Sequence, residues 1–299
     1  EAVPLLLSTT KTATLGGLTF KDDDLVTYNP DTEVATLFFD GSAFFGHNED
    51  IDAVSFLDED SIALSTKSSA NIGSLNFKDE DLVRIDLTSP TTGTASLFFD
   101  GSEHFNHNED VDAVSVLSDG SLLLSTKNTA TIGGVTFRKE DLVKFEPSTA
   151  TASLFFDGSE FFESGYGWHH GGNNNIDAVS MIDSDSIVIS TAKKAEIDDF
   201  IFEDEDLVRI DLSSPTEGLA SMFFDGSDHF DNAYKADIDA VALAPAGGEP
   251  IPEPTTMALL GIGLFGLGVN YLRRARKRCQ ISDDRIQMPE ERRWETDDR

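Results

Sequence analysis

Residues 51–100 read IDAVSFLDEDSIALSTKSSANIGSLNFKDEDLVRIDLTSPTTGTASLFFD. Four short segments in this stretch are rich in Val, Ile, Leu and Phe, which is typical of strands; they are residues 51–57, 62–66, 82–87 and 95–100. Acidic tight-turn residues separate the first two segments, and Pro, Thr, Gly and Ser separate the last two. The stretch therefore predicts a unit of four antiparallel strands.

This unit recurs along residues 1–244. The motif [Ile/Val]-Asp-Ala-Val begins at Ile51, Val111, Ile176 and Ile238, and Phe-Phe-Asp-Gly-Ser begins at Phe38, Phe98, Phe155 and Phe223. Four-stranded units repeated in this way favour a β-propeller. The chain enters at a second strand (5–9) and leaves at a first strand (238–243), so the two ends can complete one blade and close the ring.

We therefore predict an all-β fold, a propeller-like closed ring of four-stranded antiparallel repeats, over residues 1–244. Two β-sandwiches or a stacked β-solenoid made of the same strands are the alternatives. Four copies of each motif indicate four blades. The first residues, Glu1 to Pro4, lead at once into strand-like sequence without an initiator Met, so we expect a truncated or processed start that could hide further units.

The composition limits the function. The chain has 55 acidic and 22 basic residues and a net charge of −33, which repels phosphate backbones and excludes a nucleic-acid partner. With 39% hydrophobic residues and 22 Phe, the chain can form a substantial core. Its one cysteine, Cys279, follows the repeats, which therefore lack disulfides and thiolate metal sites. Neither a Gly-x-Ser-x-Gly elbow, a phosphate-binding glycine loop nor a His-Glu-x-x-His motif occurs, so we expect no catalysis.

Acidic residues that keep their place in all four units are candidate ligands for a metal ion. In a meander of strands, the loops before third strands and before first strands emerge at the same edge, so their carboxylates gather on one face. Hard oxygen ligands at this density suit Ca²⁺. The candidates are Asp24, Asp81, Asp141 and Asp206, together with Asp52, Asp112, Asp177 and Asp239. The alternative is that these side chains accept hydrogen bonds from loop backbone amides.

The third unit carries an insertion, because 20 residues separate Asp157 from Asp177 where 12 separate the equivalent Asp40 and Asp52. The inserted loop is rich in glycine and contains Tyr166, Trp168, His169 and His170. Such a loop can stack against a sugar ring or bind a transition metal. A surface elaboration without a ligand is the other interpretation.

The composition changes after Ala244. Residues 245–256 form a Pro- and Gly-rich linker, and residues 257–272 are uncharged and apolar, as in a short transmembrane helix. A basic cluster follows at 273–278 and a charged tail at 279–299. By the positive-inside rule, the basic cluster stays cytoplasmic and the acidic repeats lie on the outer side of the membrane. The basic residues are Arg273, Arg274, Arg276, Lys277 and Arg278.

Residues 251–278 resemble the PEP-CTERM sorting signal of exported bacterial proteins. The resemblance lies in Pro252, Glu253 and Pro254, the apolar segment that follows and the basic stop. It implies that an exosortase recognises Pro252-Glu253-Pro254, that the apolar helix holds the precursor in the inner membrane, and that the processed protein reaches the surface or the extracellular matrix. Proteins with this signal are often linked to exopolysaccharide and biofilm production, which makes exopolysaccharide a candidate partner.

The sequence thus predicts an exported, surface-anchored or exosortase-processed repeat protein without catalytic activity. Its acidic face is expected to bind cations, Ca²⁺ first among them, and matrix glycans. The alternative function is that of an extracellular hydrolase on a propeller scaffold, with the inserted loop lining its substrate pocket.

Overall fold

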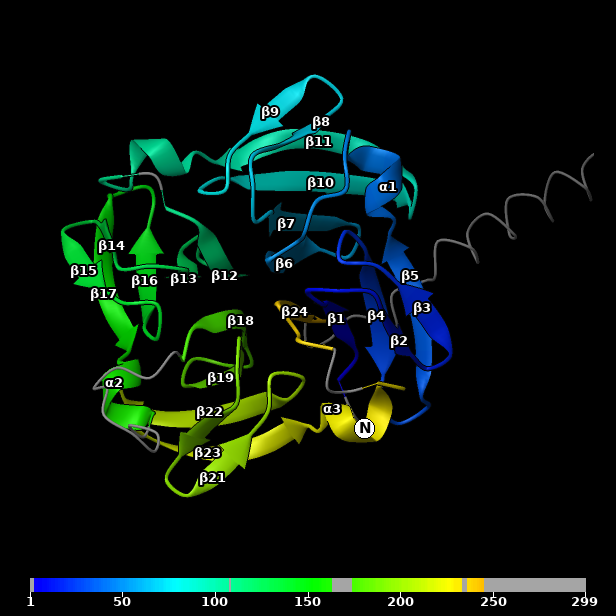
Figure 1. Cartoon of the computed structure of the whole chain (residues 1–299). Coiled ribbons are helices and arrows are strands. Elements are labelled where there is room, and N and C mark those ends of the chain that lie inside the picture. Colours follow the sequence, from blue (N-terminus) through cyan, green and yellow to red (C-terminus); the bar gives the residue numbers. More distant parts are fainter. Residues whose placement is uncertain (1–2, 108, 163–173, 233–235, 245–299) are drawn as a thin grey trace, which may run out of the picture. The chain divides into compact units, whose positions relative to one another are not determined.

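A computed structural model describes residues 3–107, 109–162, 174–232 and 236–244. The long strands among them form four sheets of four antiparallel strands each, arranged as blades around a common axis (Figure 1). The all-β, four-bladed propeller predicted from the sequence is confirmed. The predicted transmembrane segment at 257–272 lies outside the described residues.

Each blade runs from an inner strand at the axis to an outer strand at the rim. Blade 1 consists of β24 (Ala240–Leu243), β1 (Leu5–Ser8), β4 (Leu25–Asn29) and β5 (Val34–Phe39). Blade 2 consists of β6 (Ala53–Asp58), β7 (Ser61–Ser65), β10 (Leu82–Ser89) and β11 (Thr92–Phe99). Blade 3 consists of β12 (Val111–Val116), β13 (Leu122–Thr126), β16 (Leu142–Glu146) and β17 (Thr151–Phe156). Blade 4 consists of β18 (Ile176–Met181), β19 (Ser186–Thr191), β22 (Leu207–Ser214) and β23 (Glu217–Phe224).

Blade 1 is built from both ends of the repeat region. β24 is its inner strand and pairs antiparallel with β1, so that Leu5 lies opposite Leu243 and Ser8 opposite Ala240. The predicted closure of the ring is confirmed by this pairing. Inner strands also join neighbouring blades through serine side chains: Val116 N donates to Ser55 Oγ at 2.8 Å and Leu243 N to Ser180 Oγ at 3.0 Å.

A small hairpin follows the second strand of every blade, where the sequence analysis expected only a loop. The four hairpins are β2 (Ala13–Leu15) with β3 (Leu18–Phe20), β8 (Ala70–Ile72) with β9 (Leu75–Phe77), β14 (Ala130–Ile132) with β15 (Val135–Phe137), and β20 (Ala195–Ile197) with β21 (Phe200–Phe202). Their two-residue turns need positive φ, which glycine adopts without strain. Gly16 and Gly17 supply it in blade 1, at φ values of 54° and 77°.

One helical turn follows the outer strand of each blade. These turns are α1 (Gly41–Phe44), the 3₁₀ turn η1 (Gly101–Glu103), α2 (Gly158–Phe161) and α3 (Gly226–His229). The turn presses against the loop before the third strand so closely that a Cβ on Gly101 would lie 2.1 Å from the carbonyl oxygen of Glu80. The glycine of Phe-Phe-Asp-Gly-Ser is therefore required by contact between two backbones.

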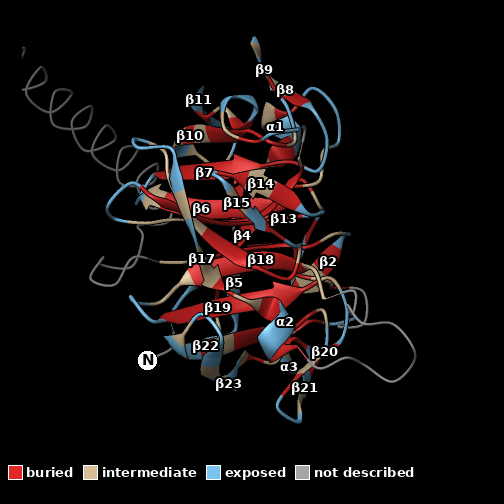
Figure 2. Cartoon of the chain, turned by 90° about the vertical axis from the view of Figure 1, so that its left-hand side faces the viewer, coloured by how far each residue is buried: buried red, intermediate tan, exposed pale blue. Residues whose placement is uncertain are grey.

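The hydrophobic core lies between the blades, in four clusters that each join two neighbouring blades. Leu6 and Ile62, for example, are both fully buried in the cluster between blades 1 and 2. Figure 2 shows the inner strands in red as buried, and pale blue at the tips of the outer hairpins. This packing holds the four inner strands against one another around the axis. Among the described residues, no helix has the length and apolar character needed to cross a membrane.

Candidate functional site

The eight aspartates predicted as metal ligands fall into two groups with different surroundings. Asp81, before the third strand of blade 2, uses both carboxylate oxygens as acceptors: Oδ1 from Gly101 N and Oδ2 from Lys78 N, each at 2.9 Å. Asp24, Asp141 and Asp206 accept from the equivalent pairs of amides at 2.8–3.1 Å. These four aspartates tie the helical turn to the loop before the third strand, which is the structural alternative that the sequence left open.

The other four aspartates converge on the axis, and we call them the axial ring: Asp52, Asp112, Asp177 and Asp239. Each stands at the start of an inner strand, directly after an apolar residue that is fully buried, such as Ile51. Because successive residues of a strand face opposite sides, the apolar residue packs against the preceding blade while the aspartate faces the next blade, as Ile51 and Asp52 show. The structure therefore brings this half of the predicted ligand set together.

The axial ring is buried and largely without partners. Asp52, Asp177 and Asp239 are each 3% exposed, and none of their carboxylate oxygens accepts a hydrogen bond from an N–H or hydroxyl donor. Asp52 can hydrogen-bond to Asp110, and Asp239 to Asp50, only when one carboxyl of the pair is protonated. Burial raises the pKa of each of these three carboxyls well above its ordinary value, and neighbouring aspartates raise it further. Burial also raises the pKa of Asp112 to about 6, although a hydrogen bond from Asn175 opposes the shift. Buried polar groups are normally hydrogen-bonded, so these oxygens are unusual.

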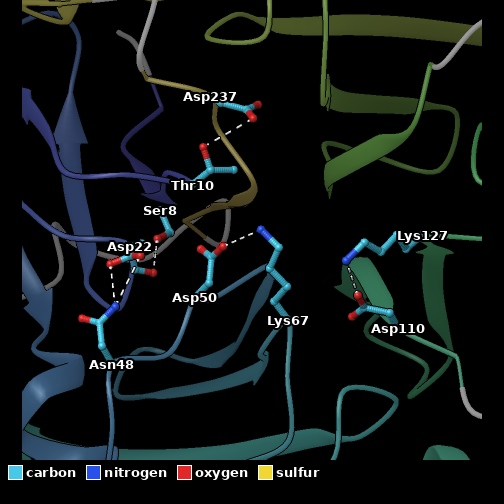
Figure 3. Close-up of polar contacts among 9 residues, drawn as sticks. All are labelled: Ser8, Thr10, Asp22, Asn48, Asp50, Lys67, Asp110, Lys127 and Asp237. Atoms are coloured by element: carbon cyan, nitrogen blue, oxygen red, sulfur yellow. Dashed lines mark hydrogen bonds and ion pairs between the residues drawn. The ribbon is translucent and has the colours of Figure 1, made fainter.

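A second ring lies two residues earlier in each unit and consists of Asp50, Asp110, Asn175 and Asp237. Two of its members form ion pairs near the axis, Asp50 with Lys67 Nζ and Asp110 with Lys127 Nζ, both at 2.9 Å (Figure 3). Asp237 instead accepts a hydrogen bond from Thr10 Oγ1 at 3.4 Å. Burial and the charge of Asp204 raise the pKa of Asp237 to about 7.

Residues of the axial ring pair with residues of the second ring across the boundary between neighbouring blades. Asp110 is the charge that most raises the pKa of Asp52, Asp237 does the same for Asp177, and Asp50 for Asp239. At the fourth position, Asn175 Nδ2 donates to Asp112 Oδ2. Each axial aspartate therefore meets the second-ring residue of the next blade. The tightest group is Asp52, Asp110 and Asp112, with one oxygen of each within 4.8 Å of the others.

The chemistry of this arrangement is that of a cation site made only of oxygen ligands. The described residues place seven carboxylates in the two rings against the ammonium groups of Lys67 and Lys127. Charged carboxylates in a buried site repel one another strongly unless a cation or protons neutralise them. Carboxylate oxygens without hydrogen-bond partners are free to act as ligands, and Asp52 offers two of them.

The residues of the second ring and their lysines were missed in the sequence analysis. That analysis required an identical residue in all four units, and Asn175 breaks the series of Asp50, Asp110 and Asp237. The two lysines are hidden in the same way, because Ala192 and Thr10 occupy the equivalent places. An Asp-x-Asp pair in three of the four units, at 50–52, 110–112 and 237–239, is the signal that could have found them.

Two histidines of the described residues, His104 and His229, pack against aromatic side chains. His229 accepts or donates a hydrogen bond with the hydroxyl of Tyr28 at 2.8 Å and stacks on Phe224, whereas His104 stacks on Phe99. The predicted ligand loop with Tyr166, Trp168, His169 and His170 lies outside the described residues, and its proposed ligand remains a prediction. The same holds for the structure of Pro252-Glu253-Pro254 and of the basic residues Arg273, Arg274, Arg276, Lys277 and Arg278.

Comparison with protein families assigns the end of the chain. Residues 250–277 match the PEP-CTERM protein-sorting motif. The chain carries a PEP-CTERM sorting signal. This confirms the resemblance found in residues 251–278. A PEP-CTERM signal indicates a membrane-anchored precursor that an exosortase processes to the cell surface, as predicted.

Comparison with solved structures finds distant matches only. One is a protein of unknown function from Bacteroides caccae, with 9% identity and a TM-score of 0.37, covering 82% of this chain and 100% of the other. Another is virginiamycin B lyase from Staphylococcus aureus, with 8% identity and a TM-score of 0.30, covering 72% of this chain and 55% of the other. No curated protein matches the sequence.

Proposed function

We propose that this protein is a surface-delivered, non-catalytic propeller that binds a divalent cation, Ca²⁺, through its axial carboxylates. The PEP-CTERM signal supports delivery to the surface. The support for cation binding comes from Asp52, Asp110 and Asp112, and above all from the Asp52 carboxylate, which is buried, accepts no hydrogen bond from an N–H or hydroxyl donor and lies within 4.8 Å of two other carboxylates.

Electrostatics favour a bound cation at this place. Two unit charges 4.8 Å apart repel by about 3 kcal/mol at an effective dielectric constant of roughly 20. Three such carboxylates therefore destabilise the charged site, and Lys127 compensates only one of them, Asp110. A divalent ion among Asp52, Asp110 and Asp112 attracts all three carboxylates, and this attraction outweighs the repulsion between them. The binding free energy then adds to the stability of the folded chain.

The donor set favours Ca²⁺ over other common ions. All nearby donors are carboxylate oxygens, with no thiolate or imidazole recorded in the group. Ca²⁺ accepts six to eight oxygen ligands in irregular geometry, whereas Mg²⁺ requires a near-ideal octahedron and Zn²⁺ prefers nitrogen and sulfur. Asp52 can contribute two oxygens and Asp110 its free Oδ1.

Calcium titration of the purified full-length chain in detergent tests the proposal. After treatment with a chelator, Ca²⁺ should bind and raise the melting temperature. Asp52→Asn should weaken binding at least tenfold, because one ligand charge is lost. Asp228→Asn is the matched control, since Asp228 is exposed on α3 and outside both rings. An unchanged melting temperature with Ca²⁺ and with chelator would remove the cation function.

We also propose that the processed protein binds a neutral matrix polysaccharide through the segment that contains Trp168. Aromatic and histidine side chains on a glycine-rich loop support this role. Binding on a glycan array without turnover, lost in Trp168→Ala but kept in Asp228→Asn, is the expected result. Hydrolysis of a polysaccharide would instead support the alternative enzymatic function. The absence of binding to every glycan on the array would contradict glycan binding.

A further inference from the structure

Asn175 differs in chemistry from the other residues of the second ring, although its backbone holds the same place. Ala192 N donates to the carbonyl oxygen of Asn175 at 3.0 Å, and equivalent hydrogen bonds occur in the other three units. The next residue, Ile176, donates its N–H at 3.0 Å to the carbonyl oxygen of Lys139, which lies in blade 3 in the loop before β16. These two hydrogen bonds fix the backbone of Asn175 at the boundary between blades 3 and 4.

The side chain of Asn175 reaches the tight group of Asp52, Asp110 and Asp112. Its Nδ2 donates to Oδ2 of Asp112, whose carboxylate lies within 4.8 Å of the other two. Its Oδ1 is buried and has no hydrogen-bond partner. Buried polar atoms are normally paired, so this oxygen requires an explanation. A cation held by the three carboxylates supplies one.

The amide of Asn175 can present either its nitrogen or its oxygen to this group. A rotation of about 180° about χ2 exchanges Oδ1 and Nδ2, and the two ends of the amide have nearly the same shape. Without an ion, the nitrogen is favoured, because it donates to the charged carboxylate of Asp112. With Ca²⁺ among the carboxylates, the oxygen is favoured, since amide carbonyl oxygens are common Ca²⁺ ligands.

The charge of the site also favours an amide at position 175. The carboxylates of the tight group carry three negative charges. Lys127 Nζ, which lies 2.9 Å from Oδ2 of Asp110, supplies one positive charge, so the net charge is −2 and matches that of Ca²⁺. An aspartate at this position, as in the other three units, would make the net charge −3. The number of charged ligands tunes Ca²⁺ sites, so a neutral oxygen here suits a divalent ion.

We infer that Asn175 is a further ligand of the cation, binding it through Oδ1, and that its neutral amide sets the preference of the site for a divalent ion. The inference rests on the proposed function, because it adds a ligand to the site at Asp52, Asp110 and Asp112. The ligands then come from the segments that begin the inner strands of blades 2, 3 and 4. One ion therefore joins three blades.

Tb³⁺ is the probe for the ligand role, because its luminescence lifetimes in H₂O and D₂O count the water molecules bound to the ion. Less than one equivalent is added to the chelator-treated full-length chain in detergent, and displacement by Ca²⁺ and loss in Asp52→Asn identify the site. Asn175→Ala should bind Tb³⁺ with one more water than the wild type, since water replaces Oδ1. Asn174→Ala, which removes the neighbouring amide outside both rings, should keep the wild-type number.

Asn175→Asp tests the role of charge. The ratio of Tb³⁺ affinity to Ca²⁺ affinity should rise by about tenfold or more, because the variant keeps an oxygen ligand and gives the site a charge that suits a trivalent ion. Asn174→Asp adds the same charge outside both rings and should leave the ratio unchanged. Thermal melts in chelator show whether each variant is folded, and Asn175→Ala carries the test if Asn175→Asp does not fold.

The outcomes separate this inference from the proposed function. Ions that bind to the wild type and are lost in Asp52→Asn, with the number of waters unchanged in Asn175→Ala, overturn the ligand role and leave the cation site intact. An extra water in Asn175→Ala with an unchanged affinity ratio in Asn175→Asp supports the ligand role and overturns the charge preference. No binding to the wild type, or binding that persists in Asp52→Asn, overturns both the inference and the proposed site.

Discussion

Lys127 Nζ lies 2.9 Å from Oδ2 of Asp110, at a point where the Asp110 side chain is 8% exposed and that of Lys127 is 44% exposed. The ion pair therefore reaches from solvent into the buried carboxylate ring. It leaves the other oxygen of Asp110 unpartnered and within reach of the tight group with Asp52 and Asp112. A fixed ammonium and a bound metal ion can thus neutralise the same carboxylate from two sides.

Lys127→Met should destabilise the metal-free protein by about 2 kcal/mol, because Asp110 is left as an uncompensated buried charge while the lysine was itself partly exposed. Added Ca²⁺ should restore most of this loss and bind more tightly than to the wild type, since a competing cation is gone. Chemical denaturation with and without Ca²⁺ measures both effects.

Lys194→Met is the control for this variant. Its ion pair with Glu203 is exposed on both sides, at 58% and 48%, so its loss should cost less than about 1 kcal/mol and leave Ca²⁺ binding unchanged. An equal loss of unfolding free energy in Lys127→Met and Lys194→Met would show that the ion pair of Asp110 with Lys127 contributes no more to stability than an exposed ion pair.

The stability of the metal-free protein should fall as the pH rises from 5 to 8. Burial raises the pKa of Asp112 from 3.8 to about 6 and that of Asp237 to about 7, so the folded state favours their protonated forms. The stability that this gives is complete below the ordinary pKa of 3.8 and is lost as the pH passes through about 6 and about 7. In chelator, the melting temperature should therefore be higher at pH 5 than at pH 8.

Ca²⁺ should reverse this trend, because it binds the charged carboxylates. Its effect on the melting temperature should be small at pH 5 and large at pH 8. In Asp112→Asn, which cannot ionise at this position, part of the pH dependence in chelator should disappear. A metal-free protein that becomes more stable between pH 5 and pH 8 would contradict the electrostatic account of the ring.

Asp81→Ala should destabilise the fold without changing the number of ions bound. Both oxygens of Asp81 accept from backbone amides, and truncation leaves the buried Gly101 N without its acceptor. The expected loss is about 2–4 kcal/mol, from two hydrogen bonds to a charged group. Calorimetry on the folded variant should still count the wild-type number of Ca²⁺ ions, whereas a lost ion would assign a ligand role to the Asp24, Asp81, Asp141 and Asp206 group.

Replacing Glu253 in the PEP-CTERM signal should block processing. Residues 250–277 match the sorting motif, and Pro252-Glu253-Pro254 is the segment that the resemblance assigns to the exosortase. In cells, Glu253→Ala should accumulate as membrane-bound precursor, while Glu249→Ala, just before the motif, should be processed normally. Fractionation and immunoblotting distinguish the two forms, and release of both at the same rate would contradict the prediction.

The repeats in the sequence were sufficient to predict the strands, the blade count and the closure of the ring. The strand predicted at 51–57 is observed at Ala53–Asp58, and that predicted at 95–100 is observed at Thr92–Phe99. The four small hairpins were not predicted, because strands of three residues carry too little periodicity to stand out from a loop. The Gly-Gly pairs at 16–17 and 133–134, a strong turn signal, could have revealed two of them.

The sequence could not separate the two groups of aspartates. Asp81 and Asp52 both recur in every unit, but one meets backbone amides from a turn 20 residues away and the other meets carboxylates from neighbouring blades. That difference depends on which strand lies innermost and which segments cross the axis, and no local pattern encodes it. The lysines at 67 and 127 escaped detection because a feature present in half of the ring does not appear as a repeat.

The ring of blades is complete only when β24, the last strand of the propeller, is paired with β1, the first. Asp237 and Asp239 arrive on the segment that leads into β24, so a chain whose final strand has not docked holds an incomplete set of carboxylates and leaves β1 as an open edge. Ions bound to the ring would then stabilise the docking of β24, the last strand of the propeller, against β1, the first. For a precursor threaded across a membrane, this docking can be completed only after the whole body has emerged.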